Sequence, residues 1–97
     1  MVEIVNSVVY DIMVCLFNLT LCGYKPTYFR ELAECVRKRR GHSNTTIQKY
    51  LRLLEEKGFL TVEKARYFPF KTKIAITKKG IDLTMLLKEM EKIISNS

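Results

Sequence analysis

The stretch TTIQKYLRLLEEKGFL, residues 45 to 60, carries the periodicity that decides the fold. Apolar side chains recur in it at three- and four-residue intervals, as on the buried face of an amphipathic helix. That face consists of Ile47, Tyr50, Leu51 and Leu54. Polar side chains occupy the opposite face, namely Thr45, Gln48, Lys49 and Arg52. The pattern predicts a helix over residues 45–57 with one core face and one hydrogen-bonding face, ended by Gly58.

Immediately before this helix lie four consecutive cations, RKRR, and then GHSN, residues 41 to 44. Gly41 is suited to end a preceding helix, and Ser43 or Asn44 offers a side-chain oxygen to cap the next one. The preceding helix is predicted over residues 28–38. Its buried side chains are Phe29, Leu32, Ala33 and Val36. The sequence therefore predicts two helices joined by a very short polar turn.

After Gly58 the period changes to that of a β-strand. Residues 59–65 and 72–77 mix β-branched and charged side chains, which predicts two strands of an antiparallel hairpin. The tip of this hairpin is ARYFPFK, residues 65 to 71, where Pro69 cannot donate a ladder hydrogen bond.

Both ends of the chain are predicted to be helical and strongly apolar. The first helix covers residues 2–22 and is stopped by GYKPT, in which Gly23 suits the helix end and Thr27 can cap the next helix. The last helix begins near Lys78 or Gly80 and is expected to bury Leu83, Leu86, Leu87, Met90 and Ile94. A second apolar flank of this helix contains Ile81, Met85 and Ile93.

Length and charge limit the possible functions. Ninety-seven residues fit a single domain, with a core over about residues 10–80, and the formal net charge is +7. Residues 37–80 hold thirteen cations and three anions, a net of +10, and the remainder holds four cations and seven anions, a net of −3. The positive charge is therefore concentrated in the middle of the fold, which favours a polyanionic partner.

The central part of the chain resembles a known family. Residues 45–60, followed by the hairpin and IAITKKG at 74–80, are similar to winged helix-turn-helix regulators of the MarR and PadR type. In that type a Leu-Glu-x-x-Gly-apolar motif ends the recognition helix, and an apolar-Thr-x-x-Gly motif leads from the wing into a C-terminal helix. The resemblance covers residues 28–82, and small winged-helix proteins of archaea and their viruses are similar too. It implies a mostly α, α+β fold with three helices, a two-stranded β-hairpin wing and a C-terminal helix.

The resemblance implies a homodimeric transcription regulator that binds double-stranded DNA in a sequence-specific manner. A helix fits the major groove, where Gln and Asn can pair with adenine and Arg and Lys with guanine. The expected base-reading residues are Asn44, Thr45, Gln48, Lys49 and Arg52. Phosphate contacts are expected from Arg37, Lys38, Arg39, Arg40, His42, Ser43 and Thr46, which position the protein without reading sequence. The wing is expected to contribute Lys64, Arg66, Tyr67, Lys71 and Lys73.

The surplus apolar surface of the two terminal helices predicts an interface with a second copy of the chain. The residues expected there are Val5, Val9, Ile12, Leu83, Leu86, Leu87, Met90 and Ile94. Neither a membrane nor a small-molecule ligand is indicated as a partner, because polar residues interrupt the apolar N-terminal stretch and no ligand motif is present.

Cys15, Cys22 and Cys35 are odd in number and lie among apolar residues, so free buried thiols are expected rather than a disulfide framework, in a cytoplasmic protein. A thiol switch at Cys22 or Cys35 is an alternative. The cysteines and His42 lack the short spacing of structural zinc sites, so no metal or other cofactor is expected. With a single histidine no catalytic triad can form, so the chain is not expected to be an enzyme.

The aromatic hairpin tip supports a second functional hypothesis. Tyr67, Phe68, Pro69 and Phe70 are typical of protein-binding hot spots rather than of polar wings. The alternative to DNA binding is therefore a winged-helix module that docks on another protein through this tip.

Overall fold

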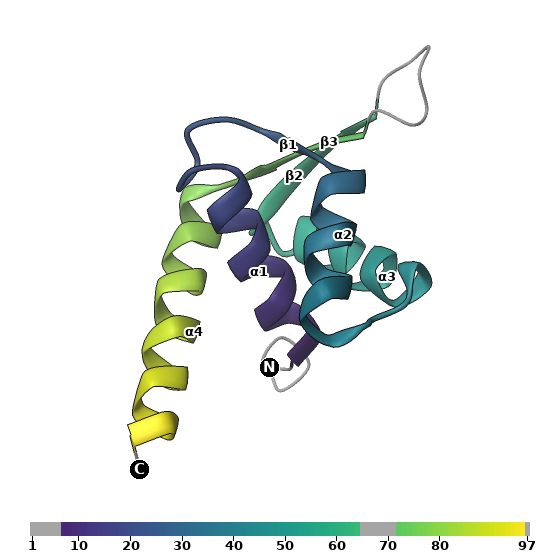
Figure 1. Ribbon diagram of the computed structural model, residues 1–97. Coiled ribbons are helices and arrows are strands. Elements are labelled where there is room, and N and C mark those ends of the chain that lie inside the picture. The colour runs from purple at the N-terminus through teal and green to yellow at the C-terminus, as the bar shows by residue number, and fades with distance from the viewer. Residues whose placement is uncertain (1–6, 65–71, 97) are drawn as a thin grey trace.

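The computed structural model describes residues 7–64 and 72–96, with side chains described as far as residue 93. The fold is α+β and mostly helical, as predicted. Its elements are α1 (Ser7–Leu19), β1 (Thr27–Tyr28), α2 (Phe29–Arg40), α3 (Asn44–Glu56), β2 (Leu60–Lys64), β3 (Thr72–Ile76) and α4 (Lys78–Asn96). Figure 1 shows α1 between α4 and α2, with the sheet at one end of these helices.

The core is built around α1, which contacts α2, α3, α4 and β3. Three apolar side chains of α1, Ile12, Met13 and Leu16, are fully buried there. The other helices and the sheet contribute further fully buried side chains, among them Leu32, Val36, Ile47, Leu54 and Ile74. Since α1 contacts the three other helices and the central strand of the sheet, its position determines where α2 and α3 lie.

Helix α1 is shorter than the predicted helix, because the described part ends at Leu19 rather than at residue 22. The chain then turns through three successive residues with left-handed backbone, Leu21 at φ 52°, Cys22 at φ 61° and Gly23 at φ 94°. Left-handed backbone cannot continue an α-helix, so Gly23 lies beyond the helix end instead of capping it directly. Residues 2–6 of the predicted helix lie outside the described residues.

The sheet has three antiparallel strands in the order β1-β3-β2, not the two that were predicted. The hairpin prediction is correct for β2 and β3, which pair Leu60 with Ile76 and Lys64 with Thr72. The additional strand β1 follows Pro26 and pairs Thr27 with Ile74. Consequently Thr27 is not a helix cap: it belongs to the sheet, and its hydroxyl donates to Glu31 Oε2 at 3.0 Å.

The predicted helix boundaries around the polar turn are correct to within two residues. Gly41 adopts φ 69° and its N–H donates to the carbonyl of Arg37 at 2.8 Å, which ends α2. Ser43 caps α3, because its hydroxyl accepts from the backbone N–H of Thr46 at 3.3 Å. The turn from α2 to α3 therefore contains only residues 41–43.

The phrase Leu-Glu-x-x-Gly-apolar corresponds to a defined helix ending. The N–H of Phe59 donates to the carbonyl of Leu54 at 3.0 Å, and the N–H of Gly58 donates to that of Glu55 at 3.0 Å. With Gly58 at φ 83° this is a Schellman motif. It turns the chain directly from α3 into β2.

The phrase Thr-x-x-Gly, residues 77–80, docks α4 on the end of α3. The Thr77 hydroxyl donates to the carbonyl of Gly58 at 2.7 Å and accepts from the N–H of Gly80 at 3.1 Å. Gly80 lies so close to the carbonyl of Phe59 that a β-carbon there would overlap it. Glycine is therefore required at this position by the packing of α4.

Only part of the predicted buried face of α4 is buried. Leu87 is 4% exposed and Leu83 is half-buried, whereas Leu86 is 59% and Met90 45% exposed. Thr84 is fully buried, and its hydroxyl donates to the carbonyl of Gly80 at 2.8 Å. The helix has apolar side chains on two sides. The prediction that Leu86 and Met90 belong to the side packed against α1 is wrong, because both face solvent.

The expectation of three free, buried cysteines is wrong. Cys15 of α1 and Cys35 of α2 form a disulfide with their Cα atoms 6.0 Å apart. Cys22 is free and exposed in the left-handed turn. The pairing follows from packing, since α1 and α2 bring together two residues that are 20 positions apart in the chain. None of the described helices is both long and apolar enough to cross a membrane.

Candidate functional site

The outer face of α3 carries all five residues predicted to read bases. These residues are exposed to solvent: Asn44, Thr45, Gln48, Lys49 and Arg52. On the opposite face Ile47, Leu51 and Leu54 are buried, which fixes the rotation of the helix about its axis. An α3 that packs in this way presents a row of hydrogen-bonding side chains to any partner that approaches from solvent.

The beginning of α3 is linked to the end of α2 by side-chain contacts. Arg37 Nη1 donates to Asn44 Oδ1 at 2.7 Å, which leaves the amide nitrogen of Asn44 as its donor. The hydroxyl of Ser43 donates to Thr46 Oγ1 at 3.0 Å, so both hydroxyl groups take part in the helix cap. Ser43 and Thr46, predicted to contact phosphate, therefore also have a structural role in starting the helix.

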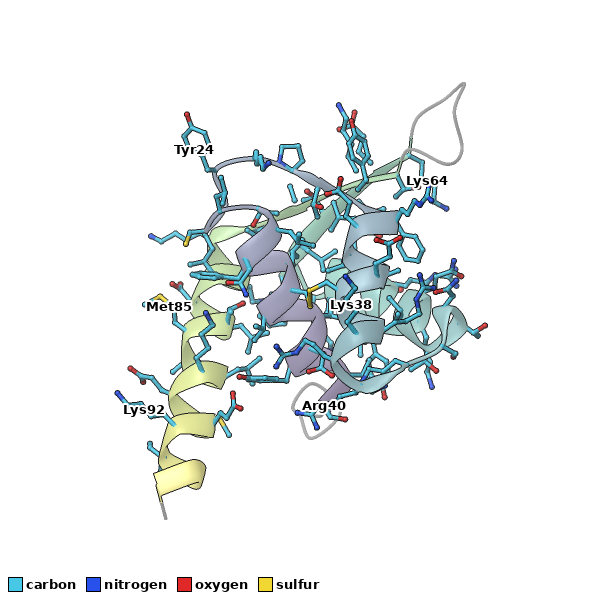
Figure 2. All side chains as sticks on the ribbon, viewed as in Figure 1. Tyr24, Lys38, Arg40, Lys64, Met85 and Lys92 are labelled. Carbon is cyan, nitrogen blue, oxygen red and sulfur yellow. A yellow bond between two sulfur atoms is a disulfide. The ribbon has the colours of Figure 1, made fainter. Side chains whose placement is uncertain are left out.

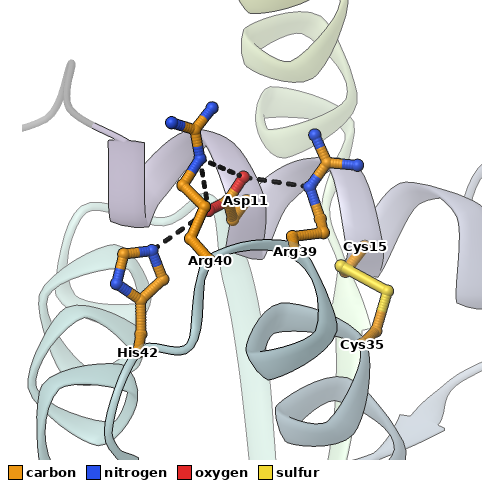
Figure 3. The surroundings of a disulfide bond; sticks show 6 residues. All are labelled: Asp11, Cys15, Cys35, Arg39, Arg40 and His42. Carbon is orange, nitrogen blue, oxygen red and sulfur yellow. Dashed lines mark hydrogen bonds and ion pairs between the residues drawn. A yellow bond between two sulfur atoms is a disulfide. The ribbon is translucent and has the colours of Figure 1, made fainter.

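Three of the remaining residues predicted to contact phosphate gather around one carboxylate, that of Asp11 in α1 (Figure 3). Arg39 Nε lies 2.9 Å from Asp11 Oδ1. Arg40 Nε lies 3.2 Å from Oδ1 and 3.0 Å from Oδ2. His42 Nε2 lies 3.0 Å from Oδ2, and because a carboxylate only accepts, this nitrogen carries the proton. Lys38, the fourth of these residues, is exposed.

Asp11 is fully buried and is not among the site residues predicted from the sequence. Burying a carboxylate is costly unless cations and hydrogen bonds compensate it, and here two arginines and a histidine do so. A signal was present in the sequence, because Asp11 interrupts an apolar helix face on which Val8 and Ile12 also lie. The partners of that acid are 28 to 31 residues away and could not be chosen from the sequence.

The disulfide lies one helical turn from this cluster, also between α1 and α2. Cys15 follows Asp11 by four residues on α1, and Cys35 precedes Arg39 by four residues on α2. Residues four apart lie on the same helix face, so the two antiparallel helices are joined at two successive levels. The ion pairs and the covalent bond together fix how the C-terminal end of α2 sits on α1.

The cations of the sheet lie at the far side of α3 from the basic turn. Lys64 ends β2, and Lys73 in β3 pairs with Glu63; both lysines are exposed. In Figure 2 Lys64 lies near the sheet in the upper part of the view and Arg40 lies in its lower part. Arg66, Tyr67 and Lys71, predicted for the wing, lie outside the described residues. The same holds for the aromatic tip, residues 67–70, on which the docking hypothesis depends.

An open hollow of about 780 Å³ lies between α3 and the sheet. Its apolar lining comes from Phe29, Leu51, Val62 and Ile74. Gln48 and Arg52 of α3 and Lys64 of β2 also line it. Two of the predicted base-reading residues, Gln48 and Arg52, and one cation of the hairpin, Lys64, therefore line the same hollow.

The predicted contact surface for a second copy must be corrected. Val9 and Ile12 are fully buried and Leu87 is nearly so, because all three pack into the core of the single chain. They cannot meet another molecule. Leu86 and Met90 remain available, whereas Val5 and the side chain of Ile94 lie outside the described residues.

The exposed apolar residues of α4 form a different face, which we call the outer face of α4. It consists of Met85, Leu86, Met90 and Ile93, with exposed fractions of 57%, 59%, 45% and 69%. Leu21 and Tyr24, in the turn after α1, are 58% and 87% exposed. In Figure 2 the labelled Met85 and Tyr24 both point away from the body of the protein.

Within the residues that the structure describes, no group of three or more His, Cys, Asp or Glu side chains could hold a metal ion. Comparison of the chain with protein-family models, with curated proteins and with solved structures found no match. The arrangement of side chains is therefore the basis for a functional assignment.

Proposed function

We propose that this protein is a sequence-specific double-stranded DNA-binding protein of the winged helix-turn-helix type, acting as a regulator of transcription. The observation that carries the proposal is the exposed polar face of α3 directly after the cationic last turn of α2. In this proposal α3 enters the major groove and the hairpin of β2 and β3 acts as the wing.

The chemistry of α3 suits base recognition. Gln48 and Asn44 have amide groups of the kind that pair with adenine, and Arg52 and Lys49 can pair with the acceptors of guanine. Residues in the first turns of a helix that inserts into the groove are those that reach base edges. The N-terminus of α3 also favours a phosphate through its free backbone N–H groups and the helix dipole.

The cations around α3 suit the DNA backbone. Arg37 to Arg40 precede the helix, and Lys64 and Lys73 lie on the hairpin beyond it. Backbone contacts of this kind supply affinity that does not depend on sequence and is sensitive to salt. They are supported by the net charge of +10 that we count over residues 37–80, thirteen cations less three anions.

A second copy is proposed to pack on the outer face of α4. Apolar side chains on one side of an exposed helix would be shielded from water in a symmetric dimer. Such a dimer can present two copies of α3 to successive major grooves, about 34 Å apart. DNA binding of this kind implies that the protein acts in the cytoplasm or another DNA-containing compartment.

Fluorescence anisotropy with random duplexes, followed by selection of bound sequences, tests this function. Selection should enrich one sequence motif, and affinity should fall by about three orders of magnitude between roughly 50 and 200 mM salt if about six phosphates are contacted. Absence of duplex binding at low salt would refute the proposal. In that case, capture of a protein partner that is lost on Phe68→Ala would support the docking hypothesis instead.

A further inference from the structure

The cluster around Asp11 has a property that charge neutralisation alone does not explain. Both arginines meet the carboxylate through Nε, and the terminal nitrogens of each guanidinium point away from it (Figure 3). The Arg39 side chain is 37% exposed and that of Arg40 is 50% exposed, although Asp11 is fully buried. Each arginine is therefore held at Nε, and the guanidinium of Arg39 also lies over the ring of Tyr10, with Cζ 5.6 Å from the ring centroid. The terminal nitrogens of both arginines have no hydrogen-bond acceptor among the described residues.

A guanidinium has five N–H donors, of which Nε provides one and the terminal nitrogens four. Among the described residues Asp11 is the one hydrogen-bond acceptor for Arg39 and for Arg40, so the terminal donors can serve another acceptor. Two terminal N–H groups in a fixed plane match the oxygens of a phosphate. An arginine held at Nε loses less side-chain freedom when it binds that phosphate.

The anchor itself is rigid. Asp11 projects from α1, the central helix of the core, and the Cys15–Cys35 disulfide fixes α2 on α1 one turn away. His42 joins the same carboxylate through Nε2, so the turn into α3 is held as well. Through these contacts Asp11 holds the two arginines in a fixed position relative to His42 and the beginning of α3.

We infer that Asp11 is a positioning residue for phosphate binding, which orients Arg39 and Arg40 so that their terminal nitrogens meet the DNA backbone beside α3. This inference rests on the proposed function. It assigns to a buried acid a favourable effect on the binding of a polyanion, although an acid that acted only through its charge would weaken that binding.

Asp11→Asn distinguishes a positioning role of Asp11 from a purely electrostatic one. It removes the negative charge of Asp11 and so raises the net charge of the protein by one. If Asp11 acts only through its charge, the variant should bind duplex DNA more tightly, since a negative charge near the polyanion has been removed. If Asp11 positions the arginines, affinity should fall by roughly tenfold. The magnitude of the salt slope should then fall by about two, because Arg39 and Arg40 would each cease to neutralise a phosphate.

The experiment measures anisotropy of a labelled selected duplex over a series of salt concentrations, with the wild-type chain and Asp11→Asn. A double-mutant cycle with Arg40→Ala should show that most of the decrease in affinity is shared, because either change removes the same oriented interaction. Equal or tighter binding by Asp11→Asn, with an unchanged salt slope, would overturn the inference. Failure of the wild-type chain to bind any duplex would instead refute the proposed function.

Should Asp11→Asn fail to fold, as judged by circular dichroism, Arg39→Lys and Arg40→Lys decide the matter. Lysine keeps the charge but has a single nitrogen in place of the anchored fork. Each variant should therefore lose affinity at unchanged net charge. Lys25→Arg, an exchange between the same two residue types at an exposed position in the turn after α1, is the control and should bind as the wild type does. Wild-type affinity in both arginine variants would overturn the inference.

Discussion

Thr77 and Gly58 are joined by a hydrogen bond of 2.7 Å from the hydroxyl of Thr77 to the carbonyl of Gly58. Through it the first turn of α4 rests on the Schellman ending of α3. The motif that ends α3, residues 54–59, and the motif that begins α4, residues 77–80, therefore meet in one junction, although the whole hairpin separates them in the sequence. The junction sets where the outer face of α4 stands relative to the polar face of α3.

This junction should not tolerate a side chain at Gly80. Gly80→Ala places a β-carbon against the carbonyl of Phe59, so we expect a loss of about 1–3 kcal/mol in the free energy of unfolding. For a chain of this size the melting temperature should fall by about 4–8 °C for each kcal/mol. Thermal unfolding followed by circular dichroism measures the effect.

Gly41→Ala is the control for that substitution. Gly41 has φ 69° but open space around its Cα, so only the backbone penalty of about 1 kcal/mol is expected. If Gly80→Ala were no more harmful than Gly41→Ala, close packing of α4 on Phe59 would not be what requires glycine at residue 80.

Reduction of the Cys15–Cys35 disulfide should destabilise the fold without unfolding it at room temperature. The bond closes a loop between residues 20 positions apart, for which chain entropy gives about 3 kcal/mol. We expect the melting temperature to fall by on the order of 15 °C in the presence of a thiol-free phosphine reductant.

The double variant Cys15→Ala, Cys35→Ala should melt at a low temperature with or without reductant. Cys22→Ser should behave as the wild type in both conditions, because Cys22 is exposed and free. A wild-type melting temperature that is the same with and without reductant would show that the cross-link contributes nothing to stability.

Substitution on the outer face of α3 should change sequence preference. Gln48→Ala or Arg52→Ala should each relax discrimination at one base position by about 1–3 kcal/mol, because each removes a side chain able to form two hydrogen bonds with a base. Competition binding with duplexes that carry single base-pair changes measures this preference.

Glu56→Ala, at an exposed position near the end of the same helix, is the matched control and should leave the preference unchanged. If neither Gln48→Ala nor Arg52→Ala altered the preference, bases would have to be read by another surface.

Charge on the outer face of α4 should separate the proposed dimer. Leu86→Lys adds one positive charge where the apolar side chain is 59% exposed, and burying that charge against a second copy would be costly. We expect light scattering to give the mass of a single chain for this variant and twice that mass for the wild type. Duplex affinity should fall in parallel.

Glu91→Gln raises the net charge by the same amount on the other side of α4 and should leave the mass unchanged. A monomeric wild-type chain at micromolar concentration would contradict the proposed role of the outer face.

Much of the fold could be predicted because its signals are local. The caps Gly41, Ser43 and Gly58 are recognised from residue type and spacing, and they give the limits of α2 and α3. Strand β1 was missed because it contains two residues and exists only through its pairing with β3. A segment that short has no periodicity of its own.

The errors in the site arose from contacts that are distant in sequence. On α4 both sides are apolar, and only the position of α1 determines that Leu87 is buried and Leu86 exposed. Asp11 and Cys15 have partners on another helix, and the sequence alone gives no register between two helices. The polar face of α3 could be predicted because the opposite face of the same helix is continuously apolar.

The left-handed turn after α1 shows where this molecule could be made more robust by protein engineering. Leu21 and Cys22 adopt a backbone conformation that costs an ordinary residue about 1–2 kcal/mol, yet both side chains face solvent. Glycine or asparagine at these two positions would relieve that penalty at a corner remote from α3. Substitutions at these two positions would therefore raise the free energy of unfolding without changing the face of α3 that is proposed to bind DNA.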